Sequence, residues 1–143
     1  MDTTTGNCTL SSQLDPIKVE QAMAMIRPAQ RIALLAHHNP DGDCIGSALG
    51  MAHILRLMGK TGVPVCAHPA PANLSFLPGL EMLQRTLGDE SFDLVIALDA
   101  SELYRFGAIY ERHKAFLDSA PMINIDHHLD TDGCGQVNII DPQ

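Results

Sequence analysis

Three side chains with the chemistry of metal ligands lie within one short segment, HHNPDGD, as His37, Asp41 and Asp43. Imidazole and carboxylate groups held this close suit Mn²⁺, Mg²⁺ or Zn²⁺. Pro40 favours an extended lead-in, because the residue before proline avoids helical dihedrals, and Gly42 allows a sharp turn. The segment therefore predicts a tight loop that gathers ionisable groups. Taken alone, it fits a metal site and ordinary turn and helix-cap chemistry about equally well.

Similar side chains follow two other apolar segments of the chain. They are Asp99, after residues 93–98, and Asp126, His127 and His128, after residues 121–125. The carboxyl ends of parallel strands share one edge of a sheet, so we expect these groups to converge with those of the first segment. Three separate coincidences of turn chemistry would otherwise be required. The combination favours a metal-binding site.

The elements that must position these groups alternate between apolar strands and helices. We expect strands at 31–36, 62–67, 93–98, 121–125 and 137–140, and helices at 16–26, 45–58 and 103–117, with a short helix or irregular connector at 80–87. This alternation predicts an α/β fold with a mainly parallel β-sheet flanked by helices and a metal site at the carboxyl ends of the strands. In the second helix, Gly46 and Gly50 are expected to allow close approach to the sheet, and Gly59 to end the helix.

Length and composition indicate one globular domain. The chain has 143 residues, 45% of them hydrophobic and 18% charged. We expect residues 1–12 to be a disordered tail or a cloning remnant, and residues 13–143 to be the domain. No apolar run approaches the roughly 18 residues of a membrane span, and the polar start is unlike a secretory signal, so a cytoplasmic location is expected. The four cysteines form no C-x-x-C pair and are expected to be reduced thiols.

The net charge of −8, with only nine lysines and arginines, argues against recognition of a polyanion by charge alone. An anionic ligand would have to be recruited by bound cations or by a segment outside this sequence. Part of the acidity is expected to belong to a metal site, since clustered carboxylates need a counter-charge.

These motifs together resemble those of the DHH phosphoesterase superfamily, over residues 30–143. The matching residues are His37, Pro40, Asp41, Gly42, Asp43, Ile45, Gly46 and Ser47 in the first motif, Asp99, Glu102, Arg105 and Gly107 in the second, Asp126, His127 and His128 in the third, and Gly135, Asn138, Asp141 and Pro142 in its continuation. The nano-RNase and pAp-phosphatase (RecJ-like) group is the most similar subfamily.

The resemblance implies a hydrolase that cleaves short oligoribonucleotides, 3′-phosphoadenosine 5′-phosphate (pAp) or both with two divalent cations, Mn²⁺ first and Mg²⁺ or Co²⁺ as alternatives. The implied ligands are His37 and Asp41 for one ion, Asp43 and His127 for the other, and Asp99 for both. The other implied roles are a catalytic and substrate-binding one for His128, an orienting catalytic one for Asp126, and a supporting one behind the ligands for Arg105.

The sequence departs from the family in two ways. Thr131 and Cys134 stand where an asparagine and a phenylalanine are common, which we interpret as tuning of the loop. The family's further aspartate ligand and its C-terminal DHH-associated domain, which would be the partner of this one, do not occur before Gln143. The chain is therefore expected to be the N-terminal part of a two-domain enzyme, or a degenerate relative, and to be weakly active or inactive alone.

Several alternatives remain open from the sequence. A family II-type inorganic pyrophosphatase is favoured by Asn39 before Pro40, and a cyclic-dinucleotide phosphodiesterase shares the same motifs. A non-catalytic regulatory or dimerisation module is the alternative from another class. A homodimer is compatible with each of them.

Overall fold

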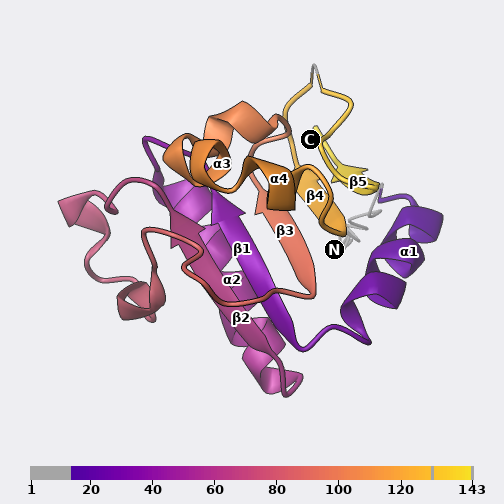
Figure 1. The fold of residues 1–143 in the computed structure, drawn as a ribbon, viewed down its shortest axis with the longest axis horizontal. Coiled ribbons are helices and arrows are strands. Elements are labelled where there is room, and N and C mark those ends of the chain that lie inside the picture. The colour runs from indigo at the N-terminus through magenta and orange to yellow at the C-terminus, as the bar shows by residue number, and fades with distance from the viewer. Residues whose placement is uncertain (1–13, 130, 143) are drawn as a thin grey trace, which may run out of the picture.

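The computed structural model describes residues 14–129 and 131–142, so the tail expected over residues 1–12 lies outside the described residues. A five-stranded, all-parallel sheet in the order β2-β1-β3-β4-β5 forms its centre, which confirms the predicted fold class (Figure 1). The strands are β1 (Arg31–Ala36), β2 (Thr61–Cys66), β3 (Leu94–Leu98), β4 (Met122–Asp126) and β5 (Val137–Ile140). The helices are α1 (Pro16–Ile26), α2 (Gly42–Leu57), α3 (Ala108–Arg112) and α4 (Lys114–Leu117), with 3-10 turns η1 (Ala72–Leu74), η2 (Leu80–Met82) and η3 (Leu103–Phe106).

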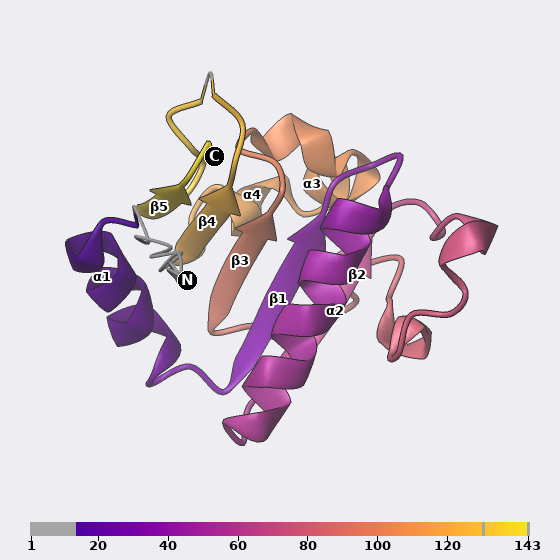
Figure 2. The same ribbon diagram turned by 180° about the vertical axis from the view of Figure 1, so that it is seen from behind.

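The strands are mainly apolar, as expected for a sheet that is covered by helices on both faces. Alternate residues of β1 enter two separate core clusters: Ile32 and Leu34 pack with α1 and α2, and Leu35 packs with η3, α3 and α4. Figure 2 shows α2 lying over β1, with α3 and α4 on the far side of the sheet. No described helix is long and apolar enough to cross a bilayer.

Helix α2 begins three residues before the predicted start, at Gly42, because Asp41 caps it by accepting a hydrogen bond from the Cys44 N–H at 3.0 Å. Its end is as predicted, with Gly59 in the left-handed region at φ +74°. The expectation for Gly46 and Gly50 is wrong, since a Cβ at either position would meet nothing within 4 Å.

The close approach between α2 and the sheet occurs instead on the strand side, at Gly62 of β2. A Cβ there would lie 3.1 Å from the Cα of Ala52 in α2. The missing side chain that lets these two elements pack therefore belongs to the strand and not to the helix.

The predicted helix over 103–117 is present in three pieces, η3, α3 and α4. Gly107, at φ +55°, separates the first two, and His113, at φ −119°, lies between the last two. The segment 80–87 contains η2 and an isolated bridge from Gln84 to Val65 of β2, in agreement with a short or irregular connector.

The strand order places a topological switch point between β1 and β3. From β1 the chain crosses to β2 on one side, and the later strands add on the other side of β1. In open α/β sheets, ligands bind in the crevice at the carboxyl ends of the strands where this reversal occurs. His37 follows β1 and Asp99 follows β3, so both residues lie at that crevice.

Candidate metal centre

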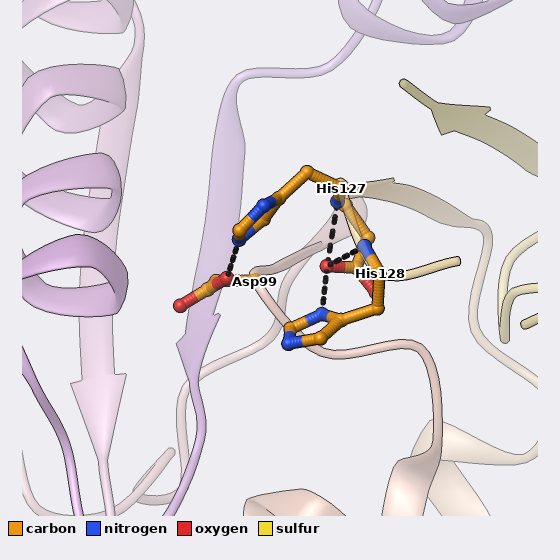
Figure 3. A group of neighbouring side chains, drawn as sticks. Asp99, His127 and His128 are labelled. Atoms are coloured by element: carbon orange, nitrogen blue, oxygen red, sulfur yellow. Dashed lines mark hydrogen bonds and ion pairs between the residues drawn. The ribbon is translucent and has the colours of Figure 1, made fainter. Parts of the chain in front are cut away.

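Asp99 lies between two histidines that come from two other strand ends. Its Oδ1 is 2.9 Å from His127 Nε2, and its Oδ2 is 3.5 Å from His37 Nε2. The Asp99 and His37 side chains are both only 7% exposed, whereas His127 is 55% exposed. Figure 3 shows the His127 ring directed at the Asp99 carboxylate. One carboxylate thus offers a separate oxygen to each of two imidazoles, which is the arrangement of a ligand that two ions can share.

The backbone of Asp99 is itself unusual. Its φ of +58° lies in the left-handed region, where residues other than glycine are uncommon and aspartate and asparagine are among the most tolerant. The Asp99 N–H continues the sheet by donating to Ile125 O at 3.0 Å. Such backbone conformations cluster at functional sites, where the surrounding structure holds them in place.

The two aspartates of the first motif complete two groups of donors around Asp99. Asp41 Oδ1 is 3.8 Å from His37 Nε2, and Asp43 Oδ2 is 3.1 Å from His127 Nε2. The backbone hydrogen bond from Cys44 lowers the pKa of Asp41, so this helix cap is ionised and available as a ligand at neutral pH. Asp41 is therefore both the N-cap of α2 and a predicted metal ligand. The structure brings all five predicted metal ligands together.

The donor set has the charge and composition that suit a divalent cation. Burial, followed by the nearby charge of Asp43, raises the pKa of Asp99, and the hydrogen bond that His127 donates to Asp99 raises the pKa of His127. Within residues 14–129 and 131–142, no lysine or arginine forms an ion pair with Asp41, Asp43 or Asp99. In this part of the chain the three carboxylates therefore have only histidines beside them as possible cations, and a divalent ion would supply the missing positive charge. Mixed oxygen and imidazole donors fit Mn²⁺, Mg²⁺ or Zn²⁺.

Cys44 also lies close to His37 and Asp41, but its chemistry is different. Burial raises the pKa of its thiol to about 12, so the sulfur stays protonated at neutral pH. A metal ligand must be the thiolate. The contribution of Cys44 is its backbone N–H, which holds Asp41 in place.

Asp126 is buried behind the two histidines that follow it and binds both of them. Its Oδ1 accepts from the His127 N–H at 2.8 Å and lies 2.6 Å from His128 Nδ1, while the Ser101 hydroxyl donates to its Oδ2. Burial raises the pKa of Asp126, but the hydrogen bonds from Ser101, His128 and His127 outweigh it, and the pKa lies below its usual range. As a result, the two adjacent rings contact different carboxylates, His127 that of Asp99 and His128 that of Asp126 (Figure 3).

Arg105 is joined to the site through its backbone. His38, next to the predicted ligand His37, donates its N–H to Arg105 O at 2.7 Å, and its ring Nδ1 lies 2.5 Å from the same oxygen. Arg105 also lines a cavity of about 430 Å³ beside His128. The cavity is lined by Ala100, Ser101, Glu102, Arg105, Asp126, His128, Leu129 and Thr131.

Nothing around His68 in the sequence predicts that it lies near the site, because no carboxylate is close to it in the chain. In the fold, its Nδ1 lies 3.0 Å from both the N and the Oδ1 of Asn39, which is left-handed at φ +51°. Asn39 precedes Pro40 and Asp41, so His68 supports the loop that presents a predicted ligand. His53, by contrast, contacts Pro78 O at 3.2 Å.

We expect His68→Ala to weaken Mn²⁺ binding and to lower the free energy of unfolding by about 1 kcal/mol, the usual contribution of one hydrogen bond. The physical reason is that the Asn39 N–H loses its acceptor while the strained backbone remains. Calorimetric titration with Mn²⁺ and urea unfolding measure the two effects. His53→Ala is the matched control and should leave the Mn²⁺ affinity unchanged. Equal Mn²⁺ affinities for both variants would contradict this role for His68.

The comparisons with known proteins agree with the geometry. The profile of the "DHH family, N-terminal domain" matches residues 31–143. The bifunctional oligoribonuclease and PAP phosphatase NrnA of Thermus thermophilus is 34% identical over 112 residues, which cover 78% of this chain and 32% of that relative. This chain therefore spans about a third of the length of that relative.

The crystal structure of an exopolyphosphatase-related protein from Bacteroides fragilis is similar in fold, with a TM-score of 0.80 at 25% sequence identity. The match covers 93% of this chain and 41% of that one. The family profile covers every strand of the sheet and every predicted metal ligand. On these grounds the chain belongs to the DHH family.

Proposed function

We propose that this chain carries the catalytic centre of a phosphoesterase that uses two divalent cations, Mn²⁺ first, to hydrolyse short oligoribonucleotides, pAp or both. The observation that supports it best is the Asp99 carboxylate, whose two oxygens face His37 and His127 separately. The similarity to NrnA supports the substrate class. We assign His37 and Asp41 to one ion, Asp43 and His127 to the other, and Asp99 to both. This division follows the pairs of side chains that lie close together.

When bound, two such cations offset the charge that grows on the phosphoryl oxygens and favour ionisation of the attacking water. The residues of the chain supply the positioning. Asp126 accepts from His128 Nδ1, which fixes the orientation of that ring. Nε2 is then the ring nitrogen left to contact a phosphoryl oxygen of the substrate. Ser101 in turn fixes Asp126 through its second oxygen.

Saturating Mn²⁺ should raise the melting temperature of the protein. The ion relieves the mutual repulsion of Asp41, Asp43 and Asp99, and a ligand at a hundredfold excess over its Kd stabilises the folded state by about 2.7 kcal/mol. Differential scanning fluorimetry with a Mn²⁺ titration measures the shift, and EDTA should reverse it. Asp89→Asn, which removes an exposed carboxylate elsewhere, serves as the control and should keep the full shift. A melting temperature that does not change when Mn²⁺ is added would contradict the proposed metal centre.

The reaction itself is tested by incubating the protein and Mn²⁺ with pApA, pAp, pyrophosphate or cyclic di-AMP and separating the products by chromatography. We expect slow release of AMP from pApA and of phosphate from pAp, and none from the Asp99→Asn variant. Faster cleavage of pyrophosphate or of the cyclic dinucleotide would support those alternative activities instead. Full Mn²⁺ binding without any turnover would favour a non-catalytic module.

A further inference from the structure

The cavity of about 430 Å³ next to His128 is separate from the five predicted metal ligands, none of which lines it. It shares two residues with the proposed catalytic centre, His128 and Asp126. A substrate whose scissile phosphate contacts His128 would therefore extend directly into this cavity. Its volume is within the range of pockets that bind small molecules, so it can hold a group much larger than a water molecule.

Arg105 is the only lysine or arginine among the described residues that line the cavity. Three other cationic side chains of the described residues form ion pairs: Arg27 pairs with Glu20, Arg31 with Glu90, and Lys114 with Asp118. For the Arg105 side chain, no ion pair forms with a carboxylate of residues 14–129 or 131–142. What distinguishes Arg105 is its position: its guanidinium has no carboxylate partner among the described residues and lines a cavity beside the site, so it can bind an anion there.

The wall that carries Arg105 is fixed in place before any substrate binds. The two contacts from His38 to Arg105 O tie η3 to the loop after β1, which also carries His37. A second link in the lining of the cavity is the hydrogen bond from Ser101 to Asp126. Residues held in this way lose little freedom on binding, so a charged contact made from this wall retains most of its energy.

We propose that this cavity is a subsite for a second anionic group of the substrate, and that Arg105 binds that group. The inference rests on the proposed function and makes it more specific. The favoured substrates carry a second phosphate on the nucleotide that adjoins the scissile one, as 5′-phosphorylated dinucleotides and nucleoside bisphosphates do. Arginine suits this role because its planar guanidinium donates two parallel hydrogen bonds to one phosphate.

Glu102 lines the same cavity and restricts how much negative charge the subsite can accept. Its carboxylate repels anions, and the exposed Tyr104 hydroxyl, whose pKa is raised by its hydrogen bond with Glu102, lies beside it. The guanidinium and the carboxylate within one cavity favour a single phosphate near Arg105 over an extended run of negative charge. This arrangement fits a short substrate with one terminal phosphate.

The test measures binding of two phosphorothioate-linked diadenosine dinucleotides, which resist hydrolysis, to the Mn²⁺-loaded protein by isothermal titration calorimetry. One carries a 5′-phosphate and the other ends in a 5′-hydroxyl. A charge-assisted contact predicts that the phosphorylated compound binds the unmodified protein roughly tenfold to a hundredfold more tightly. In Arg105→Gln this ratio should fall to about one, and Arg105→Lys should recover part of it, because it keeps the charge but loses the two-pronged geometry.

Arg112→Gln is the matched control. It removes the same charge from an exposed position on the next helix, α3, outside the cavity, and should keep the full ratio. Equal binding of the two dinucleotides by the unmodified protein, or an unchanged ratio in Arg105→Gln, would overturn this inference alone. Failure of both dinucleotides to bind in the presence of Mn²⁺ would overturn the proposed function together with it.

Discussion

The Asp99→Asn variant should fold but should no longer bind divalent cations tightly. It should hydrolyse its substrate at least about a thousandfold more slowly, which is a loss of about 4 kcal/mol of transition-state stabilisation. The amide keeps the size of the side chain and one oxygen, but it has no charge to share between two cations. Within the part of the chain that the structure describes, Asp99 is the one carboxylate within ion-pair distance of both His37 and His127, so its loss should affect both ions at once.

The same substitution has the opposite effect on the metal-free fold. Burial and the neighbouring charge of Asp43 raise the pKa of Asp99, so its ionised form costs stability as the pH rises above the usual range for an aspartate. At neutral pH the neutral amide removes that cost. In EDTA, Asp99→Asn should therefore melt at the same temperature as the unmodified protein or at a higher one. This separates the loss of metal binding from misfolding.

The experiment combines calorimetric Mn²⁺ titration, melting in EDTA and the pAp assay. Asp89→Asn is the control for the chemical change and should behave as the unmodified protein in all three. Asp126→Asn, at a residue that orients His128 and is not a proposed ligand, should retain Mn²⁺ binding and lose less activity. Equal damage from Asp99→Asn and Asp126→Asn would contradict the roles assigned to these two carboxylates.

The sequence was sufficient to predict which strand ends carry the ionisable side chains, but not the contacts between distant segments. Apolar segments alternating with helical ones identified the strands, and the rule that parallel strands end at one edge predicted that Asp99 lies near His37 and His127. The contact of His68 with Asn39 and the bond from Ser101 to Asp126 join positions 29 and 25 residues apart, and no local pattern encodes them. The prediction of a close helix–sheet contact at Gly46 and Gly50 was wrong, because a helical glycine on an open face cannot be distinguished in sequence from one at a close contact.

Gly135 illustrates a glycine whose necessity is visible only in the fold. The resemblance places it in the continuation of the third motif, and the structure supplies the reason. A Cβ at this position would lie 2.8 Å from both Asn124 N and Met122 O, and 2.9 Å from Val137 O. These are backbone atoms of β4 and β5, which cannot turn aside as a flexible side chain would.

Gly135→Ala should therefore destabilise the protein by about 3 kcal/mol or more, at the upper end of what one added methyl group costs in a packed interior. The methyl group would push β5 from β4 and disturb the reciprocal hydrogen bonds between Gly135 and Asn138, which are 2.9 and 2.8 Å long. Urea unfolding followed by circular dichroism measures the loss.

Gly50→Ala is the matched control for this substitution, with the opposite expected sign. It adds the same methyl group to a helix position where nothing lies within 4 Å, and it should stabilise the protein by about 0.5–1 kcal/mol. If Gly135→Ala costs no more than a surface substitution, the tight approach of the loop to β4 is not what holds this edge of the sheet. If it costs as much as expected, β4 and β5 are held in register by backbone packing, and this packing also sets where Asp126 and His127 emerge at the end of β4.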